Sequence, residues 1–393
     1  MSRQALDDAI WRHKLQDASG PKDLVAKLVK HNELTFFQAE QVLDGETRAL
    51  QIDGYRVVDI LGFGGMGRVY VAEEVDSGWQ VALKVLTENL RNDSSIKSRF
   101  QLEAEAGMKL DHPNIVRTRA MRKTEDIYGE IHYVVMDLIR GISLLEMVLL
   151  QGTIPVSQLC DIIMQAAQGL QAAHDVGMIH RDVKPENLLI RSNGQVKILD
   201  FGLAMLDEND QEFAMAMIHG QDSLGTADYV APEQTLDSYK VDARADIYGL
   251  GCTFYAGLTG KLPFPVKTAR EKILCHRKKK PRAIQELRSD VPDRIDRIVR
   301  KMMAKRPENR IATADQVRRL LEPYAERKDL TFDFPAILRW RAKQARKRED
   351  RIRTTDTMAA SGDSSKPSHR PERKRIAGQE SQVEFKKKKN AAK

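Results

Sequence analysis

Residues 180–202 read HRDVKPENLLIRSNGQVKILDFG, and this stretch decides the fold. Within it, the Asn193-Gly194 pair separates two short apolar runs, which is a strong short-range signal for a β-hairpin. A loop that ends at Asn187 therefore leads into a hairpin, and the far end of that hairpin brings Asp200 beside Asp182. Two acids and an amide carried by one hairpin are well placed to hold metal ions and a hydroxyl nucleophile.

The order His-Arg-Asp, then Asn five residues after the Asp, then Asp-Phe-Gly resembles the signature set of protein kinases. Lys184, in Asp-Val-Lys-Pro-Glu-Asn, is similar to the lysine of serine/threonine rather than tyrosine kinases. The resemblance implies an α+β, bilobal protein-kinase fold over about 55–323, with a small β-rich N-lobe (about 55–137) and a larger helical C-lobe (about 142–323). The phrase ELTFFQAEQVL before it resembles leaders of bacterial eukaryotic-like (Hanks-type) kinases.

A glycine-rich segment lies between two predicted strands. Taken alone, Gly-x-Gly-x-x-Gly at 62–67 is a weak signal, because dinucleotide-binding sites share it. Here residues 69–72 continue as a strand and no helix begins, so the dinucleotide interpretation fails. Glycines between strands let backbone N–H groups approach phosphates closely. The next strand, 81–86, carries Lys84, which the resemblance makes the partner of the α- and β-phosphates.

The resemblance assigns the other nucleotide contacts. Glu103, on a helix predicted over about 95–110, matches the family glutamate that pairs with Lys84. Met136 is the expected gatekeeper, and the backbone near 137–139 is expected to hydrogen-bond the adenine. The implied ATP-binding residues are Leu61, Gly62, Gly64, Gly67, Val69, Ala82, Lys84, Met136, Asp137, Leu138 and Leu189.

Gly107 is unusual within that helix, because glycine costs about 1 kcal/mol in a helix interior. Two interpretations stay open: a helix that is easily displaced and therefore regulatory, or simple tolerance of the glycine.

The implied chemistry is transfer of a phosphoryl group from ATP. Asp182 would orient the substrate hydroxyl, and Lys184 would meet the γ-phosphate. Asn187 and Asp200 would bind Mg²⁺, with Mn²⁺ as an alternative. His180 is expected to be a packed structural residue rather than a titrating base.

Further residues are expected to support the site. A helical stripe in the C-lobe, at Ile162, Ile163, Ala166, Ala167, Leu170 and Ala173, is predicted to be buried. By resemblance, Asp246 holds the catalytic-loop backbone, and Glu233 pairs with Arg310.

The activation segment is also assigned by resemblance. In related kinases a phosphate on this segment neutralises the arginine that precedes the catalytic acid, here Arg181. Residues 203–224 contain a single hydroxyl side chain, Ser223, and Asp222 falls where the phosphorylated residue is expected, just before Thr226. Asp222 is therefore either a built-in counter-charge with Ser223 as a secondary phosphosite, or a solvated loop residue.

The two flanks differ in character. Residues 1–50 are predicted to form two or three short helices, with a capping box at Thr35 and Gln38. They act either as a helical cap on the neighbouring domain or as a docking module. Residues 338–393 carry 18 basic and 7 acidic side chains, about +11, which leaves the rest of the +8 chain near −3. A basic helix over 335–350 and an otherwise disordered tail through 393 are expected.

Three cysteines lie far apart and no apolar run approaches the ~18 residues of a membrane span. A soluble, cytoplasmic protein is therefore expected. The predicted function is a serine/threonine protein kinase that also phosphorylates itself, acting on protein substrates in signalling. The alternatives are a pseudokinase scaffold, or a protein whose tail binds nucleic acid or another polyanion or acidic partner. Lys84, Asp182, Asn187 and Asp200 are all present, which disfavours the scaffold.

Overall fold

The computed structural model of the chain describes residues 3–45, 50–63, 66–126, 129–200, 227–236 and 241–344. These residues divide into two compact units. The first is drawn from residues 3–97, 119–138 and 333–344, and the second from residues 98–118 and 139–332. The first unit contains most of the strands and the second most of the helices, in keeping with the bilobal fold class that the sequence predicts; the first unit also includes the leader and residues 333–344, and residues 98–118 belong to the second.

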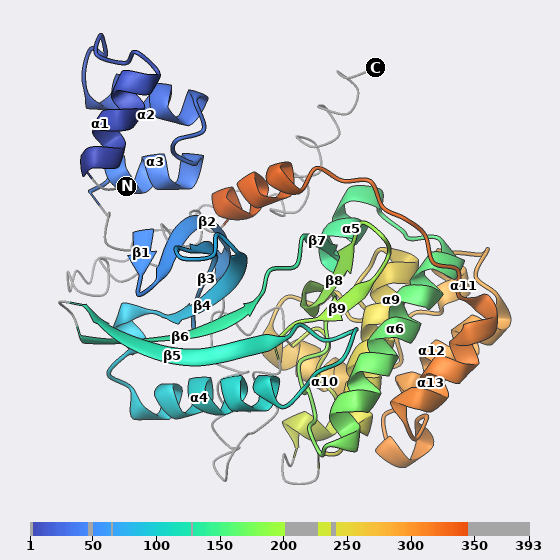
Figure 1. The fold of residues 1–393 in the computed structure, drawn as a ribbon. Helices are drawn as coiled ribbons and strands as arrows, with labels where there is room; N and C mark the ends of the chain where they lie inside the picture. The colour runs from blue at the N-terminus through green and yellow to red at the C-terminus, as the bar shows by residue number, and fades with distance from the viewer. Residues whose placement is uncertain are drawn as a thin grey trace, which may run out of the picture. The chain divides into compact units, whose positions relative to one another are not determined.

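A six-stranded sheet organises the first unit, with strand order β1-β2-β3-β4-β6-β5 (Figure 1). Its strands are β1 (Gln51–Ile52), β2 (Tyr55–Phe63), β3 (Gly67–Glu74), β4 (Gln80–Leu86), β5 (Thr118–Asp126) and β6 (Gly129–Asp137). One face buries a core that includes Tyr70, Leu83 and Tyr133. The helix predicted over 95–110 is α4 (Ser94–Met108).

The leader folds into three helices, α1 (Arg3–Arg12), α2 (Pro21–Lys30) and α3 (Phe36–Leu43). It has a small apolar core of its own, formed by Ala9, Leu15 and Leu28. The predicted capping box is present: Thr35 accepts a hydrogen bond from the Gln38 backbone, and the Gln38 side chain accepts one from Thr35. Phe37 does not belong to this small core but to the core of the six-stranded sheet. Helix α3 therefore joins the leader to that sheet within the first unit.

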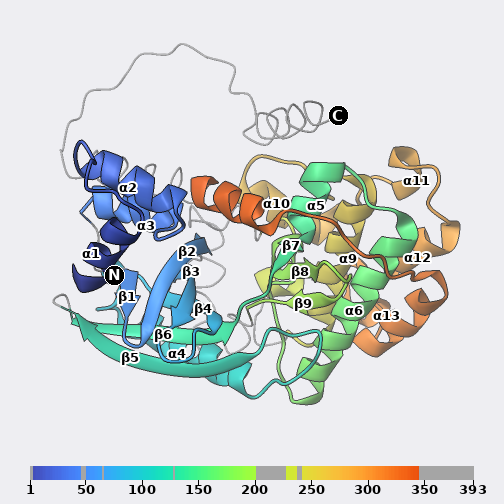
Figure 2. The same ribbon diagram turned by 45° about the horizontal axis from the view of Figure 1, so that its top comes forward.

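Residues 334–344 form a further helix of the first unit. Both views show it beside α3 (Figures 1 and 2). Ile337 and Ala342 are buried, and Ala342 lies in the same apolar core as Phe37 and Tyr70. The sequence places these residues in the tail that starts at 335, whereas the structure gives this helix a place in the folded unit.

The second unit is mainly helical. Its longer helices are α5 (Leu144–Gln151), α6 (Val156–Asp175), α9 (Arg244–Thr259), α10 (Ala269–Lys278), α12 (Asp293–Met302) and α13 (Ala314–Leu321), with the short α11 (Ile284–Leu287). The apolar stripe predicted on α6 is buried throughout. A three-stranded sheet of β7 (Gly141–Ser143), β8 (Leu188–Arg191) and β9 (Val196–Ile198) contains the predicted hairpin. Gly194 adopts φ +73° at its turn, where glycine is favoured.

Gly107 of α4 has a packing role that its position in the sequence does not reveal. A β-carbon at this residue would lie 2.4 Å from Oγ1 of Thr118, which is far inside van der Waals contact. Glycine therefore permits close approach of β5 to the helix. The structure thus supplies a reason for the glycine that neither of the two interpretations considered.

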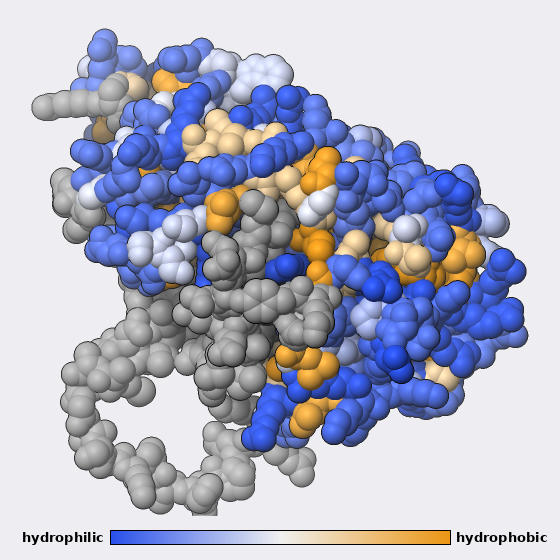
Figure 3. Space-filling view, turned by 90° about the horizontal axis from the view of Figure 1, so that it is seen from below, coloured by the Kyte–Doolittle hydropathy of each residue, from blue (hydrophilic) through white to orange (hydrophobic). Residues whose placement is uncertain are grey.

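No helix in the described ranges is both long and apolar enough to cross a bilayer. On the face drawn in Figure 3, hydrophilic side chains predominate and apolar ones gather only in small groups. Among the described residues, most large apolar side chains are buried, and only a few, such as Trp11, Phe36 and Trp79, are exposed.

Candidate active site

A buried carboxylate on α9 holds the backbone of the catalytic loop, residues 180–187. Asp246, 1% exposed, accepts hydrogen bonds from the backbone N–H groups of His180 (2.8 Å) and Arg181 (2.7 Å). His174 of α6 contacts the same carboxylate at 2.7 Å. A buried acid needs such donors, and Asp246 therefore has the position that the sequence expects for it.

His180 is fully buried and bonded at both ring nitrogens. Its Nε2 donates to the carbonyl of Leu199 (2.8 Å), and its Nδ1 accepts from the backbone N–H of Asp182 (3.2 Å). This pattern suits a neutral imidazole that links the loop to the end of β9. The ring has no face toward solvent, in keeping with a packed structural residue.

The side chains of Lys184 and Asn187, both predicted to be functional, contact Asp182. The ammonium of Lys184 donates to Asp182 Oδ2 at 2.6 Å. The amide nitrogen of Asn187 donates to the Asp182 carbonyl at 2.8 Å and to its Oδ2 at 3.3 Å. Asp182 and Lys184 keep 18% of their side-chain surface exposed, so the cluster is fixed but open to a substrate.

The hairpin brings Asp200 toward this cluster, as its topology predicts. The backbone N–H of Leu199 donates to the carbonyl of Asn187 at 2.9 Å, so the two ends of the hairpin are tied together. Asp200 is exposed. Asp200 and Arg181 are two of the few described non-glycine residues with positive φ, at +48° and +63°. Such strained backbone collects at functional sites.

In the first unit, strand register places the expected nucleotide contacts on one face of the sheet. Val69 lies opposite Lys84 across β3 and β4, and Ala82 lies opposite Met136 across β4 and β6. Because side chains alternate along a strand, Ala82 and Lys84 share a face, and Val69 and Met136 share it with them. The face opposite carries the core with Leu83 and Tyr133.

Gly67 begins β3 where the backbone passes very close to β4. A β-carbon there would lie 2.1 Å from the carbonyl oxygen of Val85, so only glycine fits without a shift of the strands. This requirement is structural and adds to the reason, closeness to phosphates, for which the sequence singles out this residue.

The remaining predicted residues are distributed as follows. Leu61, Gly62, Asp137 and Leu138 are half-buried in the first unit, and Asp137 accepts from Arg119 Nε at 2.6 Å. Lys84 is buried in the first unit, Leu189 is buried in the second, and Glu103 is on α4 in the second. Gly64, Asp222, Ser223 and Thr226 lie outside the described residues.

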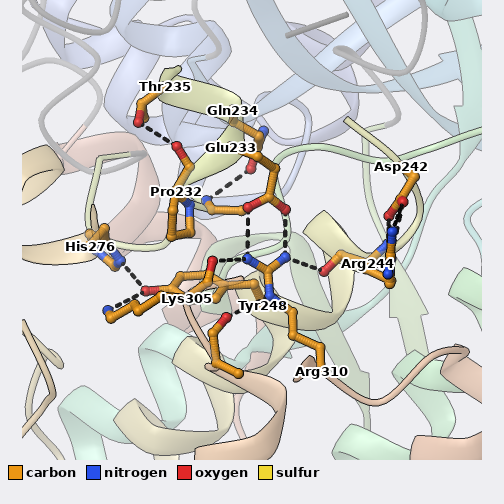
Figure 4. A network of polar contacts seen from close by, with 12 residues as sticks. Pro232, Glu233, Gln234, Thr235, Asp242, Arg244, Tyr248, His276, Lys305 and Arg310 are labelled. Atoms are coloured by element: carbon orange, nitrogen blue, oxygen red, sulfur yellow. Dashed lines mark hydrogen bonds and ion pairs between the residues drawn. The ribbon is translucent and has the colours of Figure 1, made fainter. Parts of the chain in front are cut away.

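Glu233 and Arg310 form the ion pair that the sequence pairs by resemblance (Figure 4). Arg310 Nη2 donates to Glu233 Oε2 at 2.7 Å, and the guanidinium also donates to the carbonyls of Ala304, Arg244 and Lys305. Arg310 is 4% exposed. The pair therefore ties residues 231–236, which follow the activation segment, to the body of the second unit.

Sequence reasoning missed the neighbours of this pair. Tyr248 OH contacts His276 Nδ1 at 2.9 Å and accepts from Lys305 Nζ at 3.1 Å (Figure 4). Burial, aided by the charge of Lys305, lowers the pKa of His276 to about 3. Burial also lowers the pKa of Lys305 to about 8. No spacing in the sequence marks these residues, because they come from three separate segments.

A second missed contact reaches the catalytic loop itself. Gln234 Nε2 donates to the carbonyl of Arg181 at 2.8 Å. The side chain of Arg181 has buried Nε and Nη1 atoms without a hydrogen-bond partner in the described ranges. The only sequence signal for Gln234 is that it directly follows Glu233, which the resemblance pairs with Arg310.

The fold of the two units and the anchored catalytic loop define the class as a protein kinase. The family model described as "protein kinase domain" matches residues 55–321. The chain therefore belongs to the protein kinase family. Curated relatives within that family are bacterial serine/threonine-protein kinases, in keeping with the resemblance that the sequence carries.

The similarity to curated relatives covers about two thirds of this chain. Serine/threonine-protein kinase PknB of Mycobacterium leprae is 38% identical over 272 residues, which is 68% of this chain and 42% of that protein. Serine/threonine-protein kinase PrkC of Bacillus subtilis is 32% identical over 67% of this chain and 39% of its own length. The chain thus spans about two fifths of these curated relatives.

A solved structure with the same fold is the kinase domain of PknI from Mycobacterium tuberculosis. It is 26% identical, covers 70% of this chain and 98% of its own, and has a TM-score of 0.52. The predicted fold class is confirmed. The family implies use of ATP and a divalent metal ion, and protein substrates.

Proposed function

We propose that the chain transfers the γ-phosphoryl group of Mg-ATP to serine and threonine hydroxyls of proteins, including its own. One observation carries the proposal: the Asp182 carboxylate is held between the Lys184 ammonium and the Asn187 amide, on a loop anchored by Asp246. A scaffold needs no such arrangement, whereas phosphoryl transfer depends on alignment and on neutralising charge.

Each residue of the cluster has one task in this proposal. Asp182 accepts or orients the proton of the attacking hydroxyl. Lys184, at 2.6 Å from Asp182, is near enough to share its charge between that acid and the phosphoryl group in transfer. In the first unit, Lys84 steadies the other phosphates under the backbone of Gly62 and Gly67. Such positioned acid–base help is typically worth 10²–10⁴-fold in rate.

The donor set suits magnesium. The amide nitrogen of Asn187 is bonded to Asp182, which leaves its amide oxygen to coordinate a cation. Asp200 adds an exposed carboxylate. Oxygen ligands in this small number fit Mg²⁺, which usually keeps water and phosphate oxygens in its shell, and Mn²⁺ can share such sites. When bound, the metal ion neutralises phosphate charge.

Val69 and Ala82 of the first unit would line one side of the adenine, beside Met136. The backbone from Asp137 to Leu138 would read its edge. Support comes from the register of the first unit, which gives Val69, Ala82 and Met136 one common face with Lys84.

The test is phosphate transfer to a serine/threonine peptide and to the chain itself. Asp182→Asn and Asp200→Asn should lower the rate by at least about 10²-fold. Asp76→Asn, at an exposed turn, makes the same chemical change away from the cluster and should leave the rate unchanged. Equal rates in wild type and Asp182→Asn would reveal a contaminating kinase. Nucleotide binding without transfer, under varied metal conditions, would favour the scaffold.

The basic tail has a separate proposed role. Residues 345–393, which follow the helix 334–344, carry 15 basic and 7 acidic side chains, and this charge of about +8 supports salt-dependent binding of an acidic partner or polyanion. The family model ends at residue 321, and the comparisons lend a nucleic-acid role no support. Retention of a peptide of residues 345–393 on a polyanion at low salt, lost at high salt, would support it.

A further inference from the structure

The strand that leads into the glycine-rich loop contains two irregularities. In the pairing of β2 with β3, Val57 lies opposite Ala72 and Asp59 opposite Val71, so Val58 is an extra residue on β2. The register shifts again between Ile60 and Gly62. A bulge bends its strand, increases the local twist and leaves backbone groups without a ladder partner. The course of β2 toward Gly62 therefore depends on how the first bulge is held.

Helix α3 of the leader supplies donors to this bulge. Thr35 Oγ1 donates to the carbonyl of Val58 at 2.6 Å, and Gln38 Nε2 donates to the carbonyl of Val57 at 2.8 Å. The two side chains are the members of the capping box, so each one accepts within its own helix and donates to β2. Gln38 is 9% exposed, so its bond to Val57 is shielded from water.

The outer edge of β2 explains why a helix is needed here. β1 pairs only with Tyr55 and Arg56, and its ladder ends before the bulge. Backbone groups on an open edge are usually covered by another element. Phe37 anchors α3 at this edge, since it is buried in the sheet core with its ring centroid 6.1 Å from that of Tyr70.

The other flank meets the same place. Ala342, on the helix 334–344, lies in the core that holds Phe37. Burial raises the pKa of Asp59, the residue that follows the bulge, and the charge of Arg339 on the helix 334–344 opposes that rise. Asp59 accepts from the N–H of Ile60 at 2.8 Å, between the two irregularities. Segments from both ends of the chain, outside the residues that the family model matches, thus converge on one bend of β2.

We propose that α3 is a positioning element for the nucleotide-binding loop, with Thr35 and Gln38 as its positioning residues and the helix 334–344 as a second support. The inference rests on the proposed function only in taking that loop to bind ATP. The sequence left two interpretations of the leader open, a helical cap on the neighbouring domain or a docking module. The proposal follows the first and gives the cap a functional consequence. The leader sets the path of β2 and so the affinity for nucleotide.

The chemistry of a capping box allows the two roles to be separated. Aspartate is a good N-cap and glutamate a good third residue of the box, because both accept from backbone N–H groups. Neither carboxylate can donate to a carbonyl. The double variant Thr35→Asp/Gln38→Glu therefore keeps α3 capped and removes both bonds to β2. Thr35→Ser keeps both the cap and the bond to Val58.

The test measures the Kd of a fluorescent ATP analogue with the full chain, together with amide exchange over 57–63 in the absence of nucleotide. The double variant should raise Kd by about fivefold to 150-fold, the range expected for the loss of two neutral hydrogen bonds. It should also speed exchange over 57–63. At saturating ATP, kcat should stay within about twofold. Thr35→Ser should match the wild type.

Thr268→Asp is the matched control, since it makes the same change in the capping box of α10, which is in the second unit. It should leave Kd unchanged, and an equal rise there would overturn the proposal. So would an unchanged Kd in a double variant that only melts at lower temperature, because α3 would then merely stabilise. Exchange over 57–63 needs no activity: identical exchange in variant and wild type refutes the inference even if the chain transfers no phosphate. If the wild-type chain transfers no phosphate, that result refutes only the proposed function.

Discussion

Replacing Arg310 by methionine tests how strongly the ion pair with Glu233 holds the second unit together (Figure 4). Methionine has a similar length but no charge and no donor. The change removes two bonds to Glu233 and three to backbone carbonyls, in a place where Arg310 is 4% exposed and the Glu233 side chain 13%. Removing one partner of a buried pair costs about 3–5 kcal/mol, because the other charge is left unpaired.

That loss is a large part of the 5–15 kcal/mol that typically separates folded from unfolded protein. For a domain of this size it lowers the melting temperature by on the order of 10 °C. The assay is urea unfolding followed by circular dichroism, with the melting temperature as a second measure. Arg282→Met is the matched control: its pair with Glu286 is exposed at 60% and 59%, so the loss should stay below about 1 kcal/mol.

A double-mutant cycle sharpens the result. Glu233→Gln removes the charge that Arg310→Met leaves unpaired, so the double variant should lose less stability than the sum of the single variants. Additive losses, or a loss from Arg310→Met as small as that from Arg282→Met, would refute the view that this pair is buried and coupled.

Three further predictions concern pH, chain length and activation. The pKa of His276 is lowered to about 3 by burial, against about 6.5 in an unfolded chain. The unfolded state therefore binds the extra proton, and stability should fall as pH drops from 6.5 toward 3. Urea unfolding at pH 7 and pH 5 measures the drop in the free energy of unfolding between the two pH values. This drop should be smaller in His276→Gln than in the wild type, and an equal drop in both would contradict the prediction. A chain that ends at residue 344 should unfold like the full chain. One that ends at residue 332 should lose about 2 kcal/mol, because it lacks Ile337 and Ala342, and equal stability would show that their burial contributes little. If Asp222 is the built-in counter-charge of Arg181, phosphatase-treated enzyme should keep part of its peptide activity and Asp222→Ala should lose it, whereas silencing by phosphatase with an inert Asp222→Ala would disprove the idea.

Much of the fold follows from patterns that are local in the chain. The capping box of α3, the buried stripe of α6 and the hairpin at Asn193-Gly194 are all found where the sequence predicts them. Each depends on residues within a few positions of one another, so propensity, periodicity and turn chemistry suffice. The end of the folded chain was harder to place, because the helix 334–344 is basic in composition and only two of its residues are buried.

The sequence by itself determined the class of protein and predicted the residues of its candidate site, since Asp182, Lys184, Asn187 and Asp200 fall within 19 consecutive residues whose spacing is constrained by one loop and one hairpin. Only the tertiary structure decided which distant groups these residues depend on. Gln234 reaches the carbonyl of Arg181 on the catalytic loop from more than 50 residues away. The donors of Thr35 and Gln38 have their acceptors on a bulge about 20 residues further on. A donor needs an acceptor within about 3 Å, and only the packing of separate elements determines which one lies there.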